Sequence, residues 1–226
     1  ANEGGQRVRN AETEAEKEKL NKASQFINDV LSGKTEQKHI KIDLPEYVNR
    51  KAEVQLGHKI KSHSINANEL VHSKKRHGIN GTALNENSIP LRDTDFALMP
   101  FIMAAPTRIT RGSTASNGTE SIRYEKELSN GVVIVVEREG RFDVEDMENI
   151  TMWAEKKSAT YVTVAQKASH STSETIVISE TDIAKIRNDA ENAIEKDTKN
   201  NSSNTRFSKV PNQDVFFSNA ERAVEN

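Results

Sequence analysis

Two histidines and a run of cations make the stretch "ELVHSKKRHGIN" (69–80) the part of the sequence best suited to chemistry. His72 and His77 lie five residues apart, and Lys-Lys-Arg directly precedes the second. An imidazole can donate or accept a proton near neutral pH, and cations can neutralise charge that develops on a phosphate. The pattern therefore fits cleavage of a phosphodiester. It fits as well the ordinary charged end of a solvated helix, where the helix dipole favours cations.

The same stretch predicts where these histidines stand. Asn66, with Glu69 three residues on, is a typical helix start, and Gly78 is a typical residue just beyond a helix end. On such a helix His77 occupies the last turn and His72 points to another side, so the two rings cannot clamp one metal ion. We expect the neighbouring cations to lower the pKa of His77.

Three further candidates lie on predicted strands. The segment "ESIRYEKELSNGVVIVVEREGR" (120–141) predicts a β-hairpin, because Asn-Gly separates an alternating run from an apolar run. Alternation places Lys126 on the otherwise apolar face of its strand and Arg123 on the polar face, and the less expected lysine is the better candidate for binding a phosphate. Arg111, in "TRITRG", and Thr151 can also contact a phosphate, although neither residue type needs a special reason to occur in a strand.

A small set of elements must position these candidates. Helices are predicted over residues 10–31, briefly after Pro45, over 67–77, over 96–103 with a break at Pro100, and over 181–196; extended segments are predicted at 40–44, 58–65, 150–153 and 160–165. The first half of the first helix is almost wholly charged, so only its second half is expected to dock. Helices come first and an antiparallel meander follows, which predicts an α+β fold.

Composition restricts the classes of function. The chain has 226 residues, an apolar fraction of 34%, a formal net charge of −2 and no cysteine. Any affinity for nucleic acid must therefore come from a local patch, and neither disulfides nor thiolate metal ligands can form. No apolar run approaches the roughly 20 residues of a membrane span. Motifs for dinucleotide binding, phosphate-binding loops, zinc peptidases and serine hydrolases are also missing, so we expect neither a metal nor a small-molecule cofactor.

Four motifs follow one another in an order that is more specific than any one of them. They are Arg76-His77-Gly78 at a helix end, "IPLRDTDFALMPFIMAAPTRI" (89–109), "IRYEKELSNGVVIVVE" (122–137) and "NITMWAEK" (149–156). Together they resemble the phage-associated nuclease-like domains of the barnase–EndoU–colicin–RelE superfamily. Such domains occur within large phage and mobile-element polyproteins. A chain that begins without Met fits a processed piece of such a polyprotein.

The resemblance implies an antiparallel β-meander with N-terminal helices packed on one side. It divides the chain into a connecting helix (1–37), a nuclease-like α+β domain (38–168) and a C-terminal part that contains a polar helix, a linker and a truncated end (169–226).

The resemblance also implies a metal-independent ribonuclease, in which the 2′-OH of the substrate attacks its own phosphate and DNA is not cleaved. His77 is then the general base or acid, and His72 a second titrating group. Lys126 and Arg111 are implied as cations for the phosphate or the transition state, and Thr151 as a phosphate contact. RNA is the expected partner, and no cofactor is needed.

A second function stays open at this point. The same fold suits a non-catalytic virion or cargo protein, which would contact other phage virion proteins or a second copy of the chain. Either function implies the phage virion or the bacterial host cytoplasm as the location. Convergence of His77, Lys126 and an arginine in one cleft would favour the ribonuclease.

Overall fold

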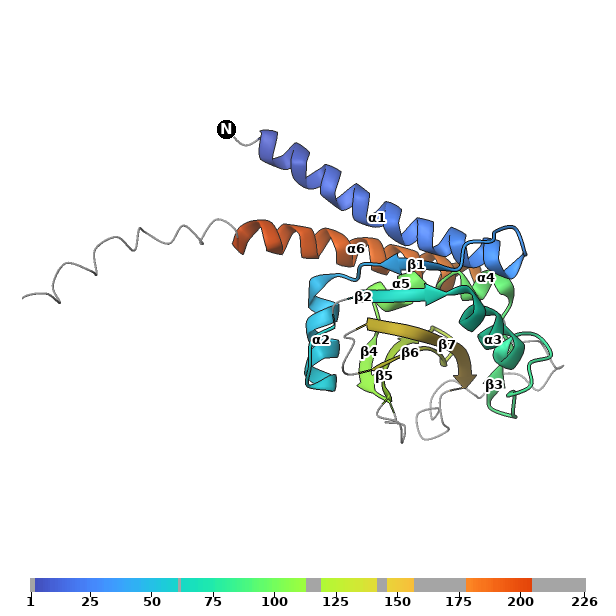
Figure 1. Ribbon diagram of the computed structural model, residues 1–226. Helices are drawn as coiled ribbons and strands as arrows, with labels where there is room; N and C mark the ends of the chain where they lie inside the picture. The colour runs from blue at the N-terminus through green and yellow to red at the C-terminus, as the bar shows by residue number, and fades with distance from the viewer. Residues whose placement is uncertain (1–2, 61, 113–118, 142–145, 157–177, 205–226) are drawn as a thin grey trace, which may run out of the picture.

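The computed structural model describes residues 3–60, 62–112, 119–141, 146–156 and 178–204 (Figure 1). Within these ranges the strands form one seven-stranded sheet with the order β1-β2-β7-β6-β5-β4, and β3 pairs with the end of β7. Neighbouring strands are antiparallel except β2 and β7, which are parallel. The strands are β1 (His39–Ile42), β2 (Ser62–Asn66), β3 (Ser88–Ile89), β4 (Arg108–Arg111), β5 (Thr119–Glu127), β6 (Val132–Arg141) and β7 (Asp146–Lys156).

Helices form a layer on one side of this sheet. They are α1 (Glu3–Leu31), α2 (Glu46–Leu56), α3 (Ala67–His77), α4 (Asp93–Phe96), α5 (Met99–Ala104) and α6 (Glu180–Asn204). α5 packs on β5 and β6, and α6 and α1 lie over α5 (Figure 1). α2 lies beside β4, and α3 lies against β7. No described helix packs across the opposite side of β5 and β6, so that side is open.

The β5–β6 hairpin forms because its residues alternate and its turn contains glycine. Pairing runs from Thr119 opposite Arg141 to Glu127 opposite Val133. Gly131 adopts a φ of 77°, a conformation that favours glycine. Every second side chain then points under the helices; the buried set on the three long strands includes Ile122, Tyr124, Ile134, Val136, Met152 and Ala154.

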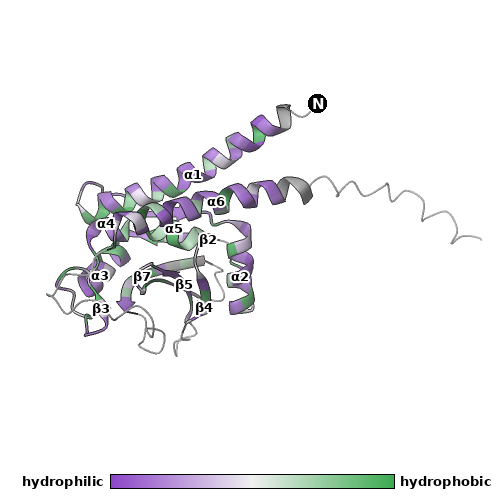
Figure 2. Cartoon of the chain, turned by 180° about the vertical axis from the view of Figure 1, so that it is seen from behind, coloured by the Kyte–Doolittle hydropathy of each residue, from purple (hydrophilic) through white to green (hydrophobic). Residues whose placement is uncertain are grey.

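The helix layer completes the same core. Figure 2 shows apolar residues along α5 and a mostly hydrophilic first half of α1. From Gln6 onward, Leu20 is the first buried residue of α1, so this part of the helix docks only by its second half, as the sequence predicts. The helix itself begins as early as Glu3. The α+β architecture and the Asn-Gly hairpin are likewise confirmed.

Three further helices differ in extent from the sequence-based prediction. The helix after Pro45 is not brief but runs to Leu56. The helix predicted over 96–103 is two helices, α4 and α5, which separate before Met99 and not at Pro100. Pro100 lies in the first turn of α5, where a proline is tolerated because that N–H has no partner within the helix.

α6 is also longer than predicted and extends into the first part of the predicted linker. Asp197 accounts for part of this difference. Its Oδ2 accepts a hydrogen bond from the backbone N–H of Glu46 at 2.8 Å, at the N-terminus of α2. A carboxylate is favourable there because the first amides of a helix lack partners within it.

Three expectations extend beyond these elements. The strand predicted at 160–165 lies outside the described residues. The division of the chain at residues 37 and 168 stays a prediction, although residues of α1 and α6 share one core with the sheet. In the described ranges, no helix combines the length and the apolar character that crossing a membrane requires.

Candidate active site

A groove of about 400 Å³ lies on the open side of the sheet. β6 and β7 form its floor, the end of α3 forms one wall, and the segment between α3 and β3 forms the other. The charged and aromatic side chains along it are Arg76, His77, Glu137, Glu139, Trp153 and Glu155, and the neutral polar ones are Asn85, Asn87, Ser88 and Thr151.

The floor is organised by strand register. Thr110, Arg123, Glu137 and Thr151 are direct partners across β4, β5, β6 and β7. Because paired residues project to the same side of a sheet, these four side chains form one row on the open face. Arg123 Nε donates to Glu137 Oε1 at 2.9 Å, and Ser121 Oγ donates to the same oxygen at 2.9 Å. A guanidinium and a carboxylate are thereby fixed at the centre of that face.

His77 reaches the groove because α3 replaces a strand at the edge of β7. β2 pairs only with the start of β7 and β3 only with its end. Between them, Ser73 Oγ accepts a hydrogen bond from Met152 N at 2.9 Å and is 3.3 Å from Met152 O, to which it donates. One helical turn later, the His77 ring lies against Trp153, with 6.0 Å between the ring centroids. Leu91 N also donates to His77 O at 3.0 Å.

The environment brings the pKa values of two groups in the groove, His77 and Glu139, closer together. Burial lowers the pKa of His77, and the positive charges of Arg76 and His72 lower it further, as the sequence predicts for neighbouring cations. Burial also raises the pKa of Glu139, helped by the nearby carboxylate of Glu137 and opposed by Arg76. His77 is therefore a stronger acid, and Glu139 a stronger base, than the same groups in water.

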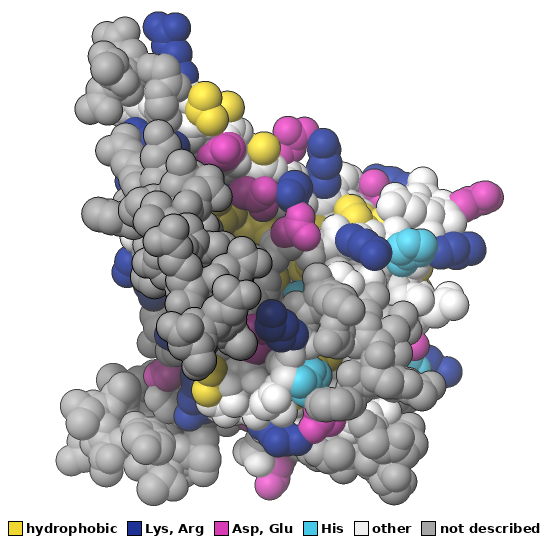
Figure 3. Space-filling model, turned by 60° about the vertical axis from the view of Figure 1, so that its left-hand side comes forward, with side chains coloured by type: hydrophobic (Ala, Val, Ile, Leu, Met, Phe, Trp, Pro, Cys, Tyr) yellow, Lys and Arg dark blue, Asp and Glu magenta, His cyan; other side chains and the backbone are white. Residues whose placement is uncertain are grey.

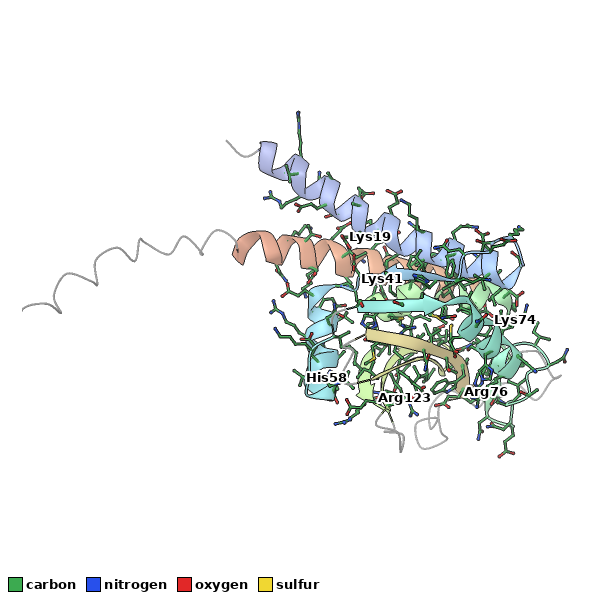
Figure 4. The ribbon with its side chains drawn as sticks, in the orientation of Figure 1. Lys19, Lys41, His58, Lys74, Arg76 and Arg123 are labelled. Carbon is green, nitrogen blue, oxygen red and sulfur yellow. The ribbon has the colours of Figure 1, made fainter. Side chains whose placement is uncertain are left out.

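Two arginines supply positive charge from different elements. Arg76 lines the groove from the last turn of α3, and Arg123 reaches it from β5, where its guanidinium carbon is 5.5 Å from the centroid of the Trp153 ring. Figure 4 shows both arginines on the side of the sheet away from α1 and α6, whereas Lys19 lies with α1. On the face shown in Figure 3, acidic and basic side chains are interspersed.

The structure brings two of the five predicted site residues into the groove, His77 and Thr151. His72 is exposed on α3 and is absent from the groove lining; it influences His77 only through its charge. The other two, Lys126 and Arg111, lie elsewhere.

Lys126 is a correction to the sequence-based expectation. It is 5% exposed on the helix-covered face of β5, and its Nζ donates to Asp189 Oδ2 at 2.7 Å and to Ala105 O at 2.8 Å. The expectation that it faces His77 across a cleft is therefore wrong. A lysine on an apolar face is unusual, but here a carboxylate of α6 explains it.

Arg111 also lies outside the groove. By register it is opposite Ile122, whose side chain belongs to the buried face, so Arg111 projects away from the row that contains Arg123. It pairs with the carboxylate of Glu120, which His58 Nε2 contacts at 2.8 Å. These three residues form a cluster near the end of α2.

Sequence reasoning missed Glu137, Glu139 and Trp153 as groove residues, and it missed Arg123 as the cation that contacts two of them. A usable signal was present, because Arg123 lies on the polar side of β5 and the two glutamates lie two residues apart on the next strand. Charged residues that alternate with apolar ones on paired strands must share one face. The preference for Lys126, as the less expected cation on the apolar face, concealed the site.

One comparison with known proteins found a match. Residues 40–161 match the model of a family described as phage-Barnase-EndoU-ColicinE5/D-RelE like nuclease3, which is more than half of the chain. The chain belongs to this family. The match confirms the resemblance to this superfamily, and origin from a polyprotein stays a prediction. No curated protein and no solved structure matches the chain.

The matched segment of this phage nuclease-like family runs from β1 through β7. It contains every residue of the groove, whereas α1 and α6 lie outside it. The groove is thus built wholly by the part of the chain that defines the family. A nuclease-like domain is the function that the family match supports.

Proposed function

We propose that this nuclease-like domain is an endoribonuclease that cleaves RNA by attack of the 2′-OH on the adjacent phosphate. The observation that carries the proposal is the meeting of three groups at one groove. His77 supplies an imidazole from α3, Glu139 supplies a carboxylate from β6, and Glu137, also in the groove, holds the guanidinium of Arg123 beside it. The reaction needs an acid, a base and a cation, and the groove offers one of each.

Glu139 is the general base in this mechanism. Its raised pKa makes it the better proton acceptor, and it lines the groove. Glu139 removes the 2′-OH proton, the 2′-oxygen forms a bond to phosphorus, and the bond from phosphorus to the 5′-oxygen breaks. His77, as imidazolium, gives its proton to that leaving oxygen. The products are a 2′,3′-cyclic phosphate and a free 5′-OH.

The cations stabilise the charge that develops on phosphorus oxygens in the transition state. Arg123 is held by Glu137 and by Trp153, so its guanidinium is already oriented before substrate binds. A planar guanidinium suits two phosphate oxygens at once. Arg76 adds a second charge from the end of α3. We assign the Thr151 hydroxyl, one strand away from Glu137, as a phosphate contact.

The test uses a single-stranded RNA oligonucleotide in the presence of a metal chelator. We expect cleavage that leaves 2′,3′-cyclic phosphate ends, and no cleavage of the DNA oligonucleotide of the same sequence, which lacks the 2′-OH. His77→Gln should lower the rate by about 10²–10⁴-fold, the usual contribution of a general acid. His72→Gln, on the same helix but exposed, is the matched control and should keep the rate.

Absence of cleavage by the folded wild-type protein between about pH 5 and about pH 8, where histidine titrates, would refute the enzyme. Equal rates for wild type and His77→Gln would remove His77 from the mechanism. Action in the host cytoplasm or in the virion stays a prediction.

A further inference from the structure

Trp153 is the one tryptophan of the chain, and it stands between two groups of the site. Its ring centroid is 6.0 Å from that of His77, with the planes inclined by 35°, and 5.5 Å from the guanidinium carbon of Arg123. β6 and then β5, which carries Arg123, lie on one side of β7, and α3, which carries His77, lies on the other. The two groups therefore approach the indole from opposite sides.

We propose that Trp153 is a positioning residue, whose indole keeps the proton donor His77 and the phosphate-binding Arg123 at a fixed separation on either side of the reacting phosphate. The proposal rests on the ribonuclease function proposed above. Trp153 transfers no proton and binds no metal; it acts through the two residues that it contacts.

Three features of the indole suit this role. Its π face attracts the guanidinium of Arg123, and its apolar surface lies against the His77 ring and helps to bury it. Its rotation is restrained, because Nε1 donates to Glu155 Oε2 at 3.3 Å. It is also a rigid, flat wall between two cations that would otherwise repel each other at short distance.

The alternative is that Trp153 is only an apolar residue that fills the sheet surface. Its location argues against this, because it lies half-buried in the groove and on the polar face of β7, away from the core. Phe101 shows how the covered face uses an aromatic ring: it is 2% exposed in α5 with the Arg187 guanidinium 4.5 Å from its centroid. Phe101 packs in the core, whereas Trp153 lies between His77 and Arg123 on the open face.

Fluorescence tests the contact without any need for activity. All tryptophan emission comes from Trp153, and an imidazolium quenches indole emission more strongly than a neutral imidazole because the cation accepts charge from the excited ring. We expect the emission of the wild type and of His72→Gln to fall as the pH decreases from about 8 to about 5, across the titration range of histidine. In His77→Gln this part of the decrease should disappear. An identical titration with and without His77 would overturn the proposal.

Kinetics test the positioning itself. Trp153→Leu should lower kcat by about 100-fold, the cost of misplacing catalytic groups by about 1 Å, while KM changes little. Its pH profile should also change: without the indole His77 is less buried, so the limb that reports His77 should move to higher pH. Trp153→Phe keeps an aromatic wall and should restore most of kcat. Wild-type kcat and an unchanged pH profile in Trp153→Leu would refute the positioning role.

The two proposals fail in different ways. A wild-type protein that cleaves no RNA refutes the ribonuclease and with it the positioning role, even where the emission titration shows that the contact exists. A protein that cleaves RNA, but whose emission ignores His77, loses only the positioning role of Trp153.

Discussion

Three consecutive residues of β6 show that the two faces of the sheet use charge differently. Glu137 and Glu139 line the open groove, whereas Arg138 between them is 0% exposed. The Arg138 guanidinium donates to the backbone oxygens of Ser64 and Met147, and so joins β2 to β7. On the covered face a charged side chain serves the fold, and on the open face it stays within reach of a ligand.

β5 repeats this division with two cations three residues apart. Arg123 is half-exposed beside the groove, where it contacts Glu137, and Lys126 is buried under α6 in contact with Asp189. Residue type alone does not separate them, because both are cations of one strand. They differ because residues three apart on a strand point to opposite faces of the sheet, and a helix covers only one of these faces. The comparison teaches that a functional cation here is one that the fold leaves accessible.

Substituting these two cations by the same residue tests the division most strongly. Arg123→Met should lower kcat/KM for RNA by about 10²–10³-fold, the usual loss when one preorganised donor is removed from a transition state. Its free energy of unfolding should change little, because the Arg123–Glu137 pair is partly exposed. RNA cleavage and urea unfolding measure the two effects on the same samples.

Lys126→Met is the matched variant on the other face. It should cleave RNA at the wild-type rate but lose about 1–3 kcal/mol of stability, because Asp189 and the backbone oxygen of Ala105 lose a donor. The division of roles would be wrong if Lys126→Met abolished cleavage while unfolding at the wild-type urea concentration.

The pH dependence of cleavage tests the open face alone. The mechanism needs Glu139 ionised, so the rate should rise with pH through a pKa that lies above the ordinary value of about 4.3. It also needs His77 protonated, so the rate should fall through a pKa below the ordinary value of about 6.5. The result is a narrow bell with its optimum in the mildly acidic range, and changes of about tenfold per pH unit on either side.

The two limbs can be assigned by substitution. The rising limb should vanish in Glu139→Gln and the falling limb in His77→Gln, whatever activity is left. An optimum on the alkaline side of the ordinary histidine pKa would contradict His77 as the acid and favour it as the base.

The sequence could predict which strand residues share a face of the sheet, but not which of the two faces carries the site. The α+β order, the Asn-Gly hairpin and the end of α3 follow from local patterns, and so does the placement of His77 in the last helical turn. Lys126 was misassigned because its partner Asp189 lies in α6, far along the chain, and no local rule reveals such an ion pair. The groove glutamates were overlooked for a different reason. The sequence of a polar strand face is the same whether that face contacts only solvent or binds a ligand.

Arg111 teaches the same lesson at the sheet edge. Its type suggested a phosphate contact, but Glu120 and His58 form a cluster with it. Thr151 lies in the groove because its strand was predicted and its side chain falls on the open face, and its contact with a phosphate stays a prediction. The location of a side chain was thus predictable where the residues that it contacts are close to it in the sequence.

Acid should affect stability through the covered face. His63 is 1% exposed, and burial together with the charge of Arg138 holds its pKa well below the ordinary value. The unfolded chain binds a proton near about pH 6.5 that the folded chain does not. The free energy of unfolding should therefore be undiminished above about pH 6.5 and decrease below it, by up to about 1.4 kcal/mol per pH unit.

Urea unfolding at a series of pH values measures this slope. His63→Gln should flatten it between about pH 6.5 and about pH 5, where histidine titrates and most carboxylates do not. His39→Gln, an exposed histidine of β1, is the control and should keep the wild-type slope. A wild-type slope in His63→Gln would show that other groups cause the loss of stability in acid.

The smallest effect is expected at Asp197, where α6 contacts the beginning of the family segment. Asp197→Ala removes the carboxylate that accepts the Glu46 N–H at the start of α2, and should cost about 1 kcal/mol, or about 3 °C in Tm. Glu191→Ala, at an exposed position of the same helix, should leave Tm unchanged. Both variants should cleave RNA normally, because α6 contributes to the covered face only. Loss of cleavage in Asp197→Ala at a temperature where it is fully folded would mean that the helix layer also shapes the groove, and the separation of the two faces would then be incomplete.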